Sequence, residues 1–197
     1  LVAVVLFVVS ATWSHAAPVL KVVDGRLAGA DHVAVGSLFF DVEFVEGTCA
    51  EVYGSCTLAA FQPFADLDTA RAAGQALLDT VLIDSALGLF DTKPELTYGC
   101  SYRGACSIFM PQTVGPTLVR GFGVNNMSPI YEPNNIDGIS SPQGVQAILD
   151  FDSRGADIVF ARWTASAAAP IPLPATPYLV VVALASLFLV RTISRAS

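Results

Sequence analysis

The chain has 197 residues, of which 53% are hydrophobic and 14% are charged, and its formal net charge is −7. All 17 acidic residues and eight of the ten basic residues lie within 17–170, so the formal charge of that region is −9. A negative surface repels phosphate groups instead of releasing their counterions, which excludes nucleic acid as an expected partner. Solubility, or loose binding of divalent cations, fits this balance better.

An uninterrupted apolar run opens the sequence, and a small-residue pattern that ends at Ala16 follows it. This order is typical of a secretory signal peptide over 1–16, with cleavage after Ala16. Cleavage after Ala17 is disfavoured, because His15 would then occupy a position that requires a small residue. Because the chain begins at Leu1 and not at a methionine, we expect the charged start of the signal to be missing from this sequence. The alternative interpretation is an N-terminal core strand.

The region 17–164 is expected to form one exported domain, because it has the size of a typical single domain and can bury a core of its own. β-Branched and aromatic residues predict strands at 19–23, 33–35 and 38–45. Side chains alternate along 38–45, so one face of that strand should form core. The predicted core face is Leu38, Phe40, Val42 and Phe44, and the opposite face is Phe39, Asp41, Glu43 and Val45.

One clear helix is predicted, over 65–82, because apolar residues recur there at helical spacing. Either Asp66 or Asp68 is expected to cap its N-terminus. The predicted buried stripe is Leu67, Ala70, Gly74, Leu77, Leu78 and Val81.

Further strands are predicted at 106–110, 117–124 and 158–164, whereas 125–144 is rich in Asn, Pro, Gly and Ser and predicts a long loop. Alternating strands with short connections favour an α+β fold, in which an antiparallel β-sheet carries one main helix. An N-terminal signal helix and a C-terminal transmembrane helix are expected in addition.

Four cysteines lie in the exported region as two close pairs, Cys49 with Cys56 and Cys100 with Cys106. Four cysteines allow three connectivities, and local pairing is the most economical because each pair brackets a turn-like segment. In an oxidising compartment we expect two disulfides. A zinc site is the alternative, but the spacings are wider than the two to four intervening residues that are usual in such sites.

No catalytic motif stands out in the sequence. His32 is the histidine that remains after signal cleavage, and it is expected to be an exposed turn residue after Asp31, with no nucleophile motif beside it. Asp41 and Glu43 share a strand face and are candidates for an acid and base pair. Carboxylates on a solvated strand face explain the same pattern, so no catalytic residue is predicted.

A calcium site is the remaining ligand hypothesis. The run from Asp150 to Gly155 begins like a calcium-binding loop, but Arg154 takes the third ligand position and Ala161 the twelfth, which excludes an EF-hand. A looser site would use Asp150 and Asp152, with Asn134, Asn135 or Asp137. The acidic balance and the expected external location motivate this hypothesis, and no cofactor is predicted.

The C-terminal part begins with an alanine-rich linker at 165–170 and the motif Ile-Pro-Leu-Pro-Ala at 171–175. An apolar span at 177–190 and a basic tail at 191–197 follow, with Arg191 and Arg195 as the only charges of the tail. A bilayer core requires roughly 20 helical residues, so this is a short transmembrane helix. The positive-inside rule places the tail in the cytoplasm and the preceding domain outside. A buried C-terminal helix is the alternative.

This order of motif, span and basic tail resembles the PEP-CTERM sorting signal of Gram-negative bacteria, in the variant that reads Val-Pro-Leu-Pro-Ala. Ile171 stands here in place of the valine, and the matching positions are Pro172, Leu173, Pro174 and Ala175. The resemblance implies recognition by an exosortase, cleavage near the motif, and release to the cell surface or matrix. It also implies contact with the secretion machinery, and with the inner membrane before processing. The run 38–49 resembles the N-terminal part of other small PEP-CTERM proteins of unassigned function.

Three classes of function are compatible with these residues. The favoured one is a non-enzymatic surface or matrix protein, associated with exopolysaccharide, because the family resemblance and the absence of catalytic motifs agree. The second is a small module that binds glycan or calcium. The third is a secreted hydrolase, which requires a pocket that gathers His32 with a nucleophile or with several acidic residues.

Overall fold

The computed structural model of the chain describes residues 17–61, 63–64, 66–114, 118–134, 136–140, 145–148, 152–154 and 157–167. The predicted signal peptide, the sorting motif, the membrane span and the basic tail lie outside these residues. Among the residues that are described, no helix is long and apolar enough to cross a membrane.

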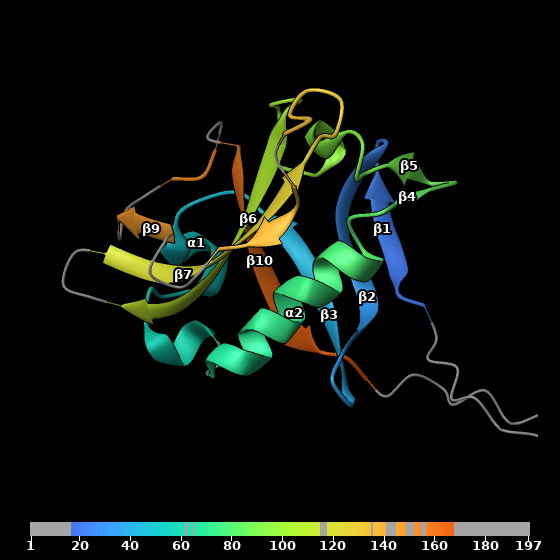
Figure 1. Ribbon diagram of the computed structural model, residues 1–197. Coiled ribbons are helices and arrows are strands. Elements are labelled where there is room, and N and C mark those ends of the chain that lie inside the picture. Colours follow the sequence, from blue (N-terminus) through green and yellow to red (C-terminus); the bar gives the residue numbers. More distant parts are fainter. Residues whose placement is uncertain are drawn as a thin grey trace, which may run out of the picture. The chain divides into compact units, whose positions relative to one another are not determined.

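Eight strands of the described region form one twisted sheet in the order β1-β2-β3-β10-β6-β7-β8, with β9 also paired to β7 (Figure 1). Their bounds are β1 Val19–Val23, β2 Arg26–Val35, β3 Leu38–Val45, β6 Ala105–Val114, β7 Leu118–Met127, β8 Gly138–Ile139, β9 Val145–Ile148 and β10 Ile158–Ala165. A separate small hairpin joins β4, Asp84–Ser85, to β5, Gly88–Leu89. The α+β prediction is confirmed at this level.

The prediction of a purely antiparallel sheet is wrong, because the sheet is mixed. β10 is antiparallel to β3, with Trp163 opposite Val42, and parallel to β6, with Phe160 opposite Phe109. β3 and β6 run in opposite directions, so any strand inserted between them must be parallel to one of the two. β10, the last strand among the described residues, takes that central place, and local strand patterns contain no information about it.

The first and third strands begin and end where the sequence predicts. β2 is longer than the predicted 33–35. A bulge between Ala30 and Val33 interrupts its alternation of buried and exposed side chains, so the part before the bulge could not be recognised as a strand from the sequence pattern. β6 and β7 are also longer than predicted. β7 extends into the predicted loop 125–144, where Asn126 is buried and its Nδ2 donates to the carbonyl of Phe90 at 2.7 Å. That loop contains β8 as well.

The main helix, α2, spans Leu67–Thr80, within the predicted 65–82. Of the two predicted cap candidates, Asp66 is the cap, and it accepts a hydrogen bond from the Thr69 N–H at 2.8 Å. Its buried stripe is Ala70, Ala73, Gly74 and Leu77. Leu67 was predicted to be buried but is 51% exposed. A helical side chain covers the turn that precedes its own Cα, and Leu67 is the first helical residue, so no turn lies beneath it.

The face prediction for β3 is confirmed at three of four positions. Phe40, Val42 and Phe44 are buried, whereas Leu38 is 59% exposed. Leu38 is the first residue of β3 and pairs with Val35 at the hairpin end, where the sheet stops. A side chain at the end of a strand can therefore be exposed even when alternation places it on the core face.

Two helical segments cover opposite faces of the sheet. Alternation in β6 turns Ile108 and Met110 toward the cluster that includes α2, and turns Phe109 toward a second cluster. The second cluster contains Val52 from the short helix α1, Cys49–Tyr53, and Phe61 from the 3-10 helix η1, Leu58–Phe61. Neither α1 nor η1 was predicted, and the same holds for a second 3-10 turn, η2, Pro94–Leu96.

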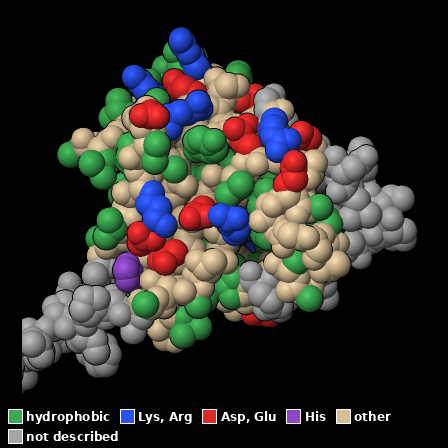
Figure 2. Space-filling view, turned by 180° about the vertical axis from the view of Figure 1, so that it is seen from behind, with side chains coloured by type: hydrophobic (Ala, Val, Ile, Leu, Met, Phe, Trp, Pro, Cys, Tyr) green, Lys and Arg blue, Asp and Glu red, His purple; other side chains and the backbone are tan. Residues whose placement is uncertain are grey.

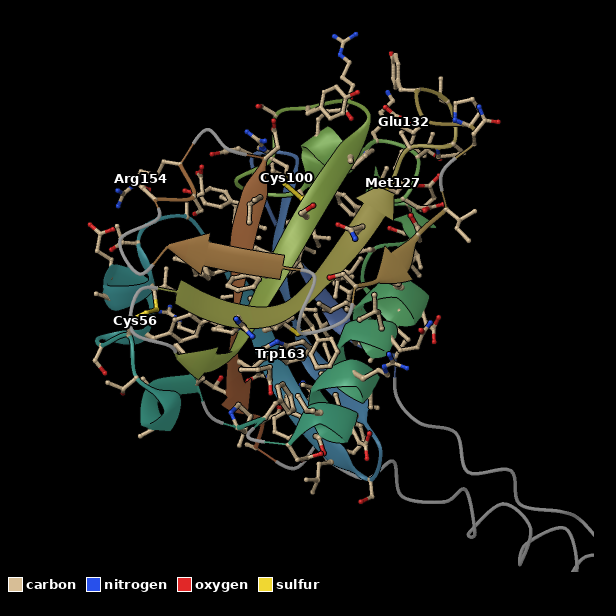
Figure 3. The ribbon with its side chains drawn as sticks, turned by 60° about the vertical axis from the view of Figure 1, so that its left-hand side comes forward. Cys56, Cys100, Met127, Glu132, Arg154 and Trp163 are labelled. Atoms are coloured by element: carbon tan, nitrogen blue, oxygen red, sulfur yellow. A yellow bond between two sulfur atoms is a disulfide. The ribbon has the colours of Figure 1, made fainter. Side chains whose placement is uncertain are left out.

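Two disulfides lie in separate parts of the fold (Figure 3). The structure joins Cys49 to Cys56 across α1 and Cys100 to Cys106 at the start of β6, which is the local pairing among the three possible connectivities. No cysteine remains free, and a zinc site is therefore excluded. The first loop is helical and not merely a turn, because Thr48 and Glu51 form a capping box at its start.

The packing of α2 predicts unequal effects for two leucines on the same helix. Leu77→Ala removes a fully buried side chain and should lower the free energy of unfolding by about 3 kcal/mol. Leu67→Ala is the matched control and should change it by less than about 0.5 kcal/mol. Urea unfolding followed by Trp163 fluorescence measures both, and equal losses would contradict the assigned helix face.

Candidate functional site

The face of the sheet turned away from α2 carries alternating charges. Figure 2 views the molecule from that side and shows acidic and basic side chains intermixed over its centre. We call the surface formed by Lys21, Asp31, Asp41, Glu43 and Arg162 the open face. These residues come from β1, β2, β3 and β10, and they project opposite to the buried Phe40 and Val42.

Strand register aligns three of these residues, Lys21, Glu43 and Arg162, in one row with Gly29. Lys21 lies opposite Gly29, Gly29 opposite Glu43, and Glu43 opposite Arg162. Neighbouring strands are about 4.8 Å apart, so Lys21 and Glu43 flank a gap two strand spacings wide. Because Gly29 has no side chain, the floor of that gap is bare.

The glycine at position 29 is required by its surroundings. Its φ is +149°, and an added Cβ would lie 2.1 Å from the main-chain oxygen of Val42. Main-chain atoms of the neighbouring strand cannot move aside without breaking the register. The gap between Lys21 and Glu43 is therefore a fixed property of the fold.

A groove of about 640 Å³ runs beside this row. Lys21 and Glu43 contribute its charged lining, and Val23, Ala28, Val45 and Tyr98 are among its other lining residues. Val23 is 56% exposed and Tyr98 is 43% exposed. The groove thus combines an exposed aromatic ring and aliphatic surface with one cation and one anion, and its volume is in the range of small-molecule and oligomer binding sites.

Ion pairs hold the charged groups of the open face. Lys21 Nζ lies 2.7 Å from Asp31 Oδ1, and Arg162 pairs with Glu43. The hydrogen bond from Lys21 to Asp31 raises the pKa of the ammonium, against the opposing effect of burial, and the charges of Asp31, Glu43 and Asp41 add to the rise. Lys21 is therefore a permanent cation at neutral pH.

The two carboxylates proposed as an acid and base pair do not have the required properties. Burial acts to raise the pKa of Asp41, but hydrogen bonds from the His32 N–H and from Ser166, with the charge of Lys21, hold it below its usual value. A general acid at neutral pH requires a raised pKa. Asp41 is thus an ionised acceptor, and Glu43 is held by Arg162.

His32 lies within β2 at the bulge, not in an exposed turn. Its φ is +59°, and its main-chain N–H donates to Asp41 Oδ1 at 3.0 Å. Positive φ is uncommon for a residue with a side chain, and histidine tolerates it better than most. The main-chain hydrogen bond of His32 and the charge of its side chain both act on Asp41, so this position helps to hold that carboxylate.

Two of the described calcium candidates, Asp152 and Asp137, are engaged in other contacts. Asp152 receives the Arg154 main-chain N–H at 3.0 Å and pairs with the Arg154 guanidinium at 2.8 Å. Arg154 also pairs with Glu51 at 2.9 Å, so a cation occupies the place of a third ligand. Asp137 instead accepts a hydrogen bond from the Met127 N–H at 2.6 Å.

The other three calcium candidates are Asn134, Asn135 and Asp150. Asn134 is exposed, and Asp150 and Asn135 lie outside the described residues. Within the described ranges, no three His, Cys, Asp or Glu side chains are arranged to hold a metal ion.

A second cavity lies inside the fold, between the two clusters. Its volume is about 10 Å³, enough for roughly one water molecule. Gln112 and Trp163 line it, and Gln112 Oε1 and Trp163 Nε1 are buried without a protein partner. Phe64 packs edge-on against Trp163 at 5.1 Å between ring centroids. This cavity is a detail of core packing, because it is too small for an organic ligand.

Comparisons with known proteins identify no relative: no family model, no curated protein and no solved structure matches this chain. The site must therefore be interpreted from its own geometry.

Sequence reasoning did not predict the groove. Alternation in 19–23 and in 158–164 indicates that Lys21 and Arg162 lie opposite the core side chains of their strands. Only strand order shows that both lie in the same row as Glu43. Tyr98 follows an irregular segment, and the sequence contains no signal that it borders the groove.

The close approach of the β3 main chain to Gly29 predicts that adding a single methyl group there is strongly destabilising. Gly29→Ala should lower the free energy of unfolding by about 2 kcal/mol or more, because the new Cβ collides with the main chain of β3. Gly138→Ala is the matched control, since no atom lies within 4 Å of a Cβ built there. Chemical unfolding of both variants tests this, and a neutral Gly29→Ala would contradict the geometry.

Proposed function

We propose that this chain is an exported, non-enzymatic protein of the cell surface or extracellular matrix, sorted and cleaved at its PEP-CTERM-like signal and associated with exopolysaccharide. The observation that carries the proposal is the pairing of all four cysteines in two disulfides. Disulfides form and persist in oxidising compartments and are rare in the cytosol. The pairing therefore agrees with the export that the two ends of the sequence predict.

The route follows from the predicted segments. The secretion machinery removes the signal peptide at Ala16, and the span 177–190 holds the chain in the inner membrane with its C-terminus in the cytoplasm. An exosortase then cuts near Ala175 and releases the domain to the surface or the medium. The negative charge of the domain keeps it soluble there, and nucleic acid is not a partner.

Mapping the C-terminal peptide of the protein from its producing cells and from their medium by mass spectrometry tests the sorting step. The mature chain should end near Pro174 or Ala175. Replacing Pro172 and Pro174 together by alanine should block cleavage, so that the chain accumulates in the membrane fraction and ends at Ser197. Pro170→Ala, just outside the motif, is the matched control and should be processed normally. A wild-type chain that ends at Ser197 in the membrane would make the tail a plain anchor.

The groove on the open face favours a second function, a small glycan-binding module. Sugar recognition commonly combines an aromatic ring for the apolar face of the sugar with fixed polar groups for its hydroxyls. Tyr98 supplies the ring. Lys21, which is paired with Asp31, and Glu43, which is paired with Arg162, supply the polar groups. The geometry supports the calcium-binding and hydrolase alternatives less well, since Arg154 neutralises Asp152 and Asp41 has a lowered pKa.

Affinity electrophoresis in gels that contain exopolysaccharide from the producing cells tests the glycan function. Wild type should be retarded, and Tyr98→Ala should weaken binding about fivefold, which corresponds to the roughly 1 kcal/mol of one aromatic contact. Tyr131→Ala is the matched control, because Tyr131 is similarly exposed, at 51%, but lies outside the groove. Equal retardation of all three proteins would exclude the groove as the binding site.

A further inference from the structure

Two acidic side chains from separate segments meet at the end of the fold that carries β8. Asp91 follows the β4–β5 hairpin and Asp137 immediately precedes β8, and a hydrogen bond joins their side chains. A hydrogen bond between two carboxyl groups requires a proton on one of them. Burial, followed by the charge and hydrogen bond of Asp137, raises the pKa of Asp91. Asp91 therefore keeps its proton to a higher pH than an ordinary aspartate does, and Asp137 Oδ1 accepts a hydrogen bond from the Met127 N–H at 2.6 Å.

The surroundings of this pair are acidic. The charged groups that act on the Asp91 carboxyl are Asp137, from the segment before β8, and Asp84, from β4. Asp84 Oδ1 accepts the main-chain N–H groups of Asp91 and Thr92 at 3.0 Å each. Burial acts to raise the pKa of Asp84, but hydrogen bonds from Thr92 and Asp91 hold it below its usual value, so Asp84 is charged. Loss of the Asp91 proton therefore places a new negative charge beside two other acidic side chains, Asp84 and Asp137.

One partner of the pair is firmly anchored. Phe90 is fully buried and its carbonyl accepts a hydrogen bond from Asn126 Nδ2 at 2.7 Å. The carbonyl of Thr92 accepts one from Ser128 Oγ at 2.8 Å. The main chain on both sides of Asp91 is thus fixed to β7 and its end.

The other partner belongs to a much shorter element. β8 has two residues, which pair Ile139 with Val124 and Gly138 with Asn125. Ile139 reaches over the middle of α2, where its Cδ1 would lie 3.3 Å from a Cβ built at Gly74. A contact that holds Asp137 therefore also holds Ile139 against the core.

We propose that Asp91 and Asp137 form a proton-dependent clasp, which holds β8 against β7 and α2 in an acidic medium and loosens it as the medium becomes neutral. The sign follows from linkage. A carboxyl with a raised pKa in the folded state stabilises that state while it is protonated, and the contribution is lost as the pH rises from the ordinary aspartate range, about 3.9, through the native pKa. For each unit by which the pKa of Asp91 is raised in the closed state, deprotonation lowers the equilibrium constant for closing about tenfold.

Amide hydrogen exchange of the full chain between pH 4 and pH 8, corrected for the intrinsic exchange rate, tests the clasp. In wild type, protection of the 136–140 segment should fall as the pH rises, about tenfold for each unit by which the pKa is raised. In Asp91→Asn, the amide donates to Asp137 at every pH, so protection should be constant. Asp137→Asn should behave in the same way, because its amide oxygen still accepts from Met127 and its NH₂ donates to Asp91.

Asp24→Asn makes the same charge change in the β1–β2 turn and is the matched control, since asparagine tolerates the φ of +50° found there. It should keep the wild-type pH dependence. Trp163 fluorescence reports whether each variant is folded. Protection of 136–140 that does not change with pH in wild type would overturn the proposal, and so would a wild-type pH dependence that survives in both Asp91→Asn and Asp137→Asn.

Discussion

The insertion of β10 between β3 and β6 is the constraint on which the rest of the structure depends. β10 supplies residues to both hydrophobic clusters, with Ala161 and Trp163 toward α2 and Phe160 toward α1. Without it, β1, β2 and β3 would form one sheet, and β6 to β9 another. The pairing of β10 with β3 joins segments that are far apart in the sequence, so it closes a long loop at a high cost in chain entropy. The burial of both clusters must offset that cost together.

Irregular segments at the ends of the sheet are held by side chains that bind main-chain groups. Arg26, at the start of β2, donates to the carbonyls of Glu95, Thr97 and Cys100, and so fixes the approach to the second disulfide. Asp157 accepts the N–H groups of Ser101 and Tyr102 in the same region, at 2.7 Å each. Such contacts satisfy main-chain donors and acceptors that have no partner in a neighbouring strand. The two disulfides also hold short segments, 49–56 and 100–106.

The open face and the Asp91–Asp137 pair differ in how they manage charge. On the open face both cations of the named set, Lys21 and Arg162, are paired with an acid, and Asp41 adds one further negative charge. Burial and the nearby acids Asp137 and Asp84 raise the pKa of Asp91, and in the proposed clasp a proton offsets that acidic charge. The acidic side chains are therefore arranged differently in the two places: they form ion pairs on the open face and lie beside one another around Asp91.

Part of the local structure was readable from the sequence by itself, whereas the short helical segments α1, η1 and η2 were not predicted. The alternation of 38–45, the helix with its Asp66 cap, and the pairing of neighbouring cysteines each depend on residues less than twenty positions apart. Tertiary structure alone decided the parallel pairing of β10, the exposure of Leu38 and Leu67, and the groove beside Gly29. Those features join residues that are far apart in the chain, or depend on where an element ends against its neighbours, and the periodicity of a single segment is the same whichever strand lies beside it.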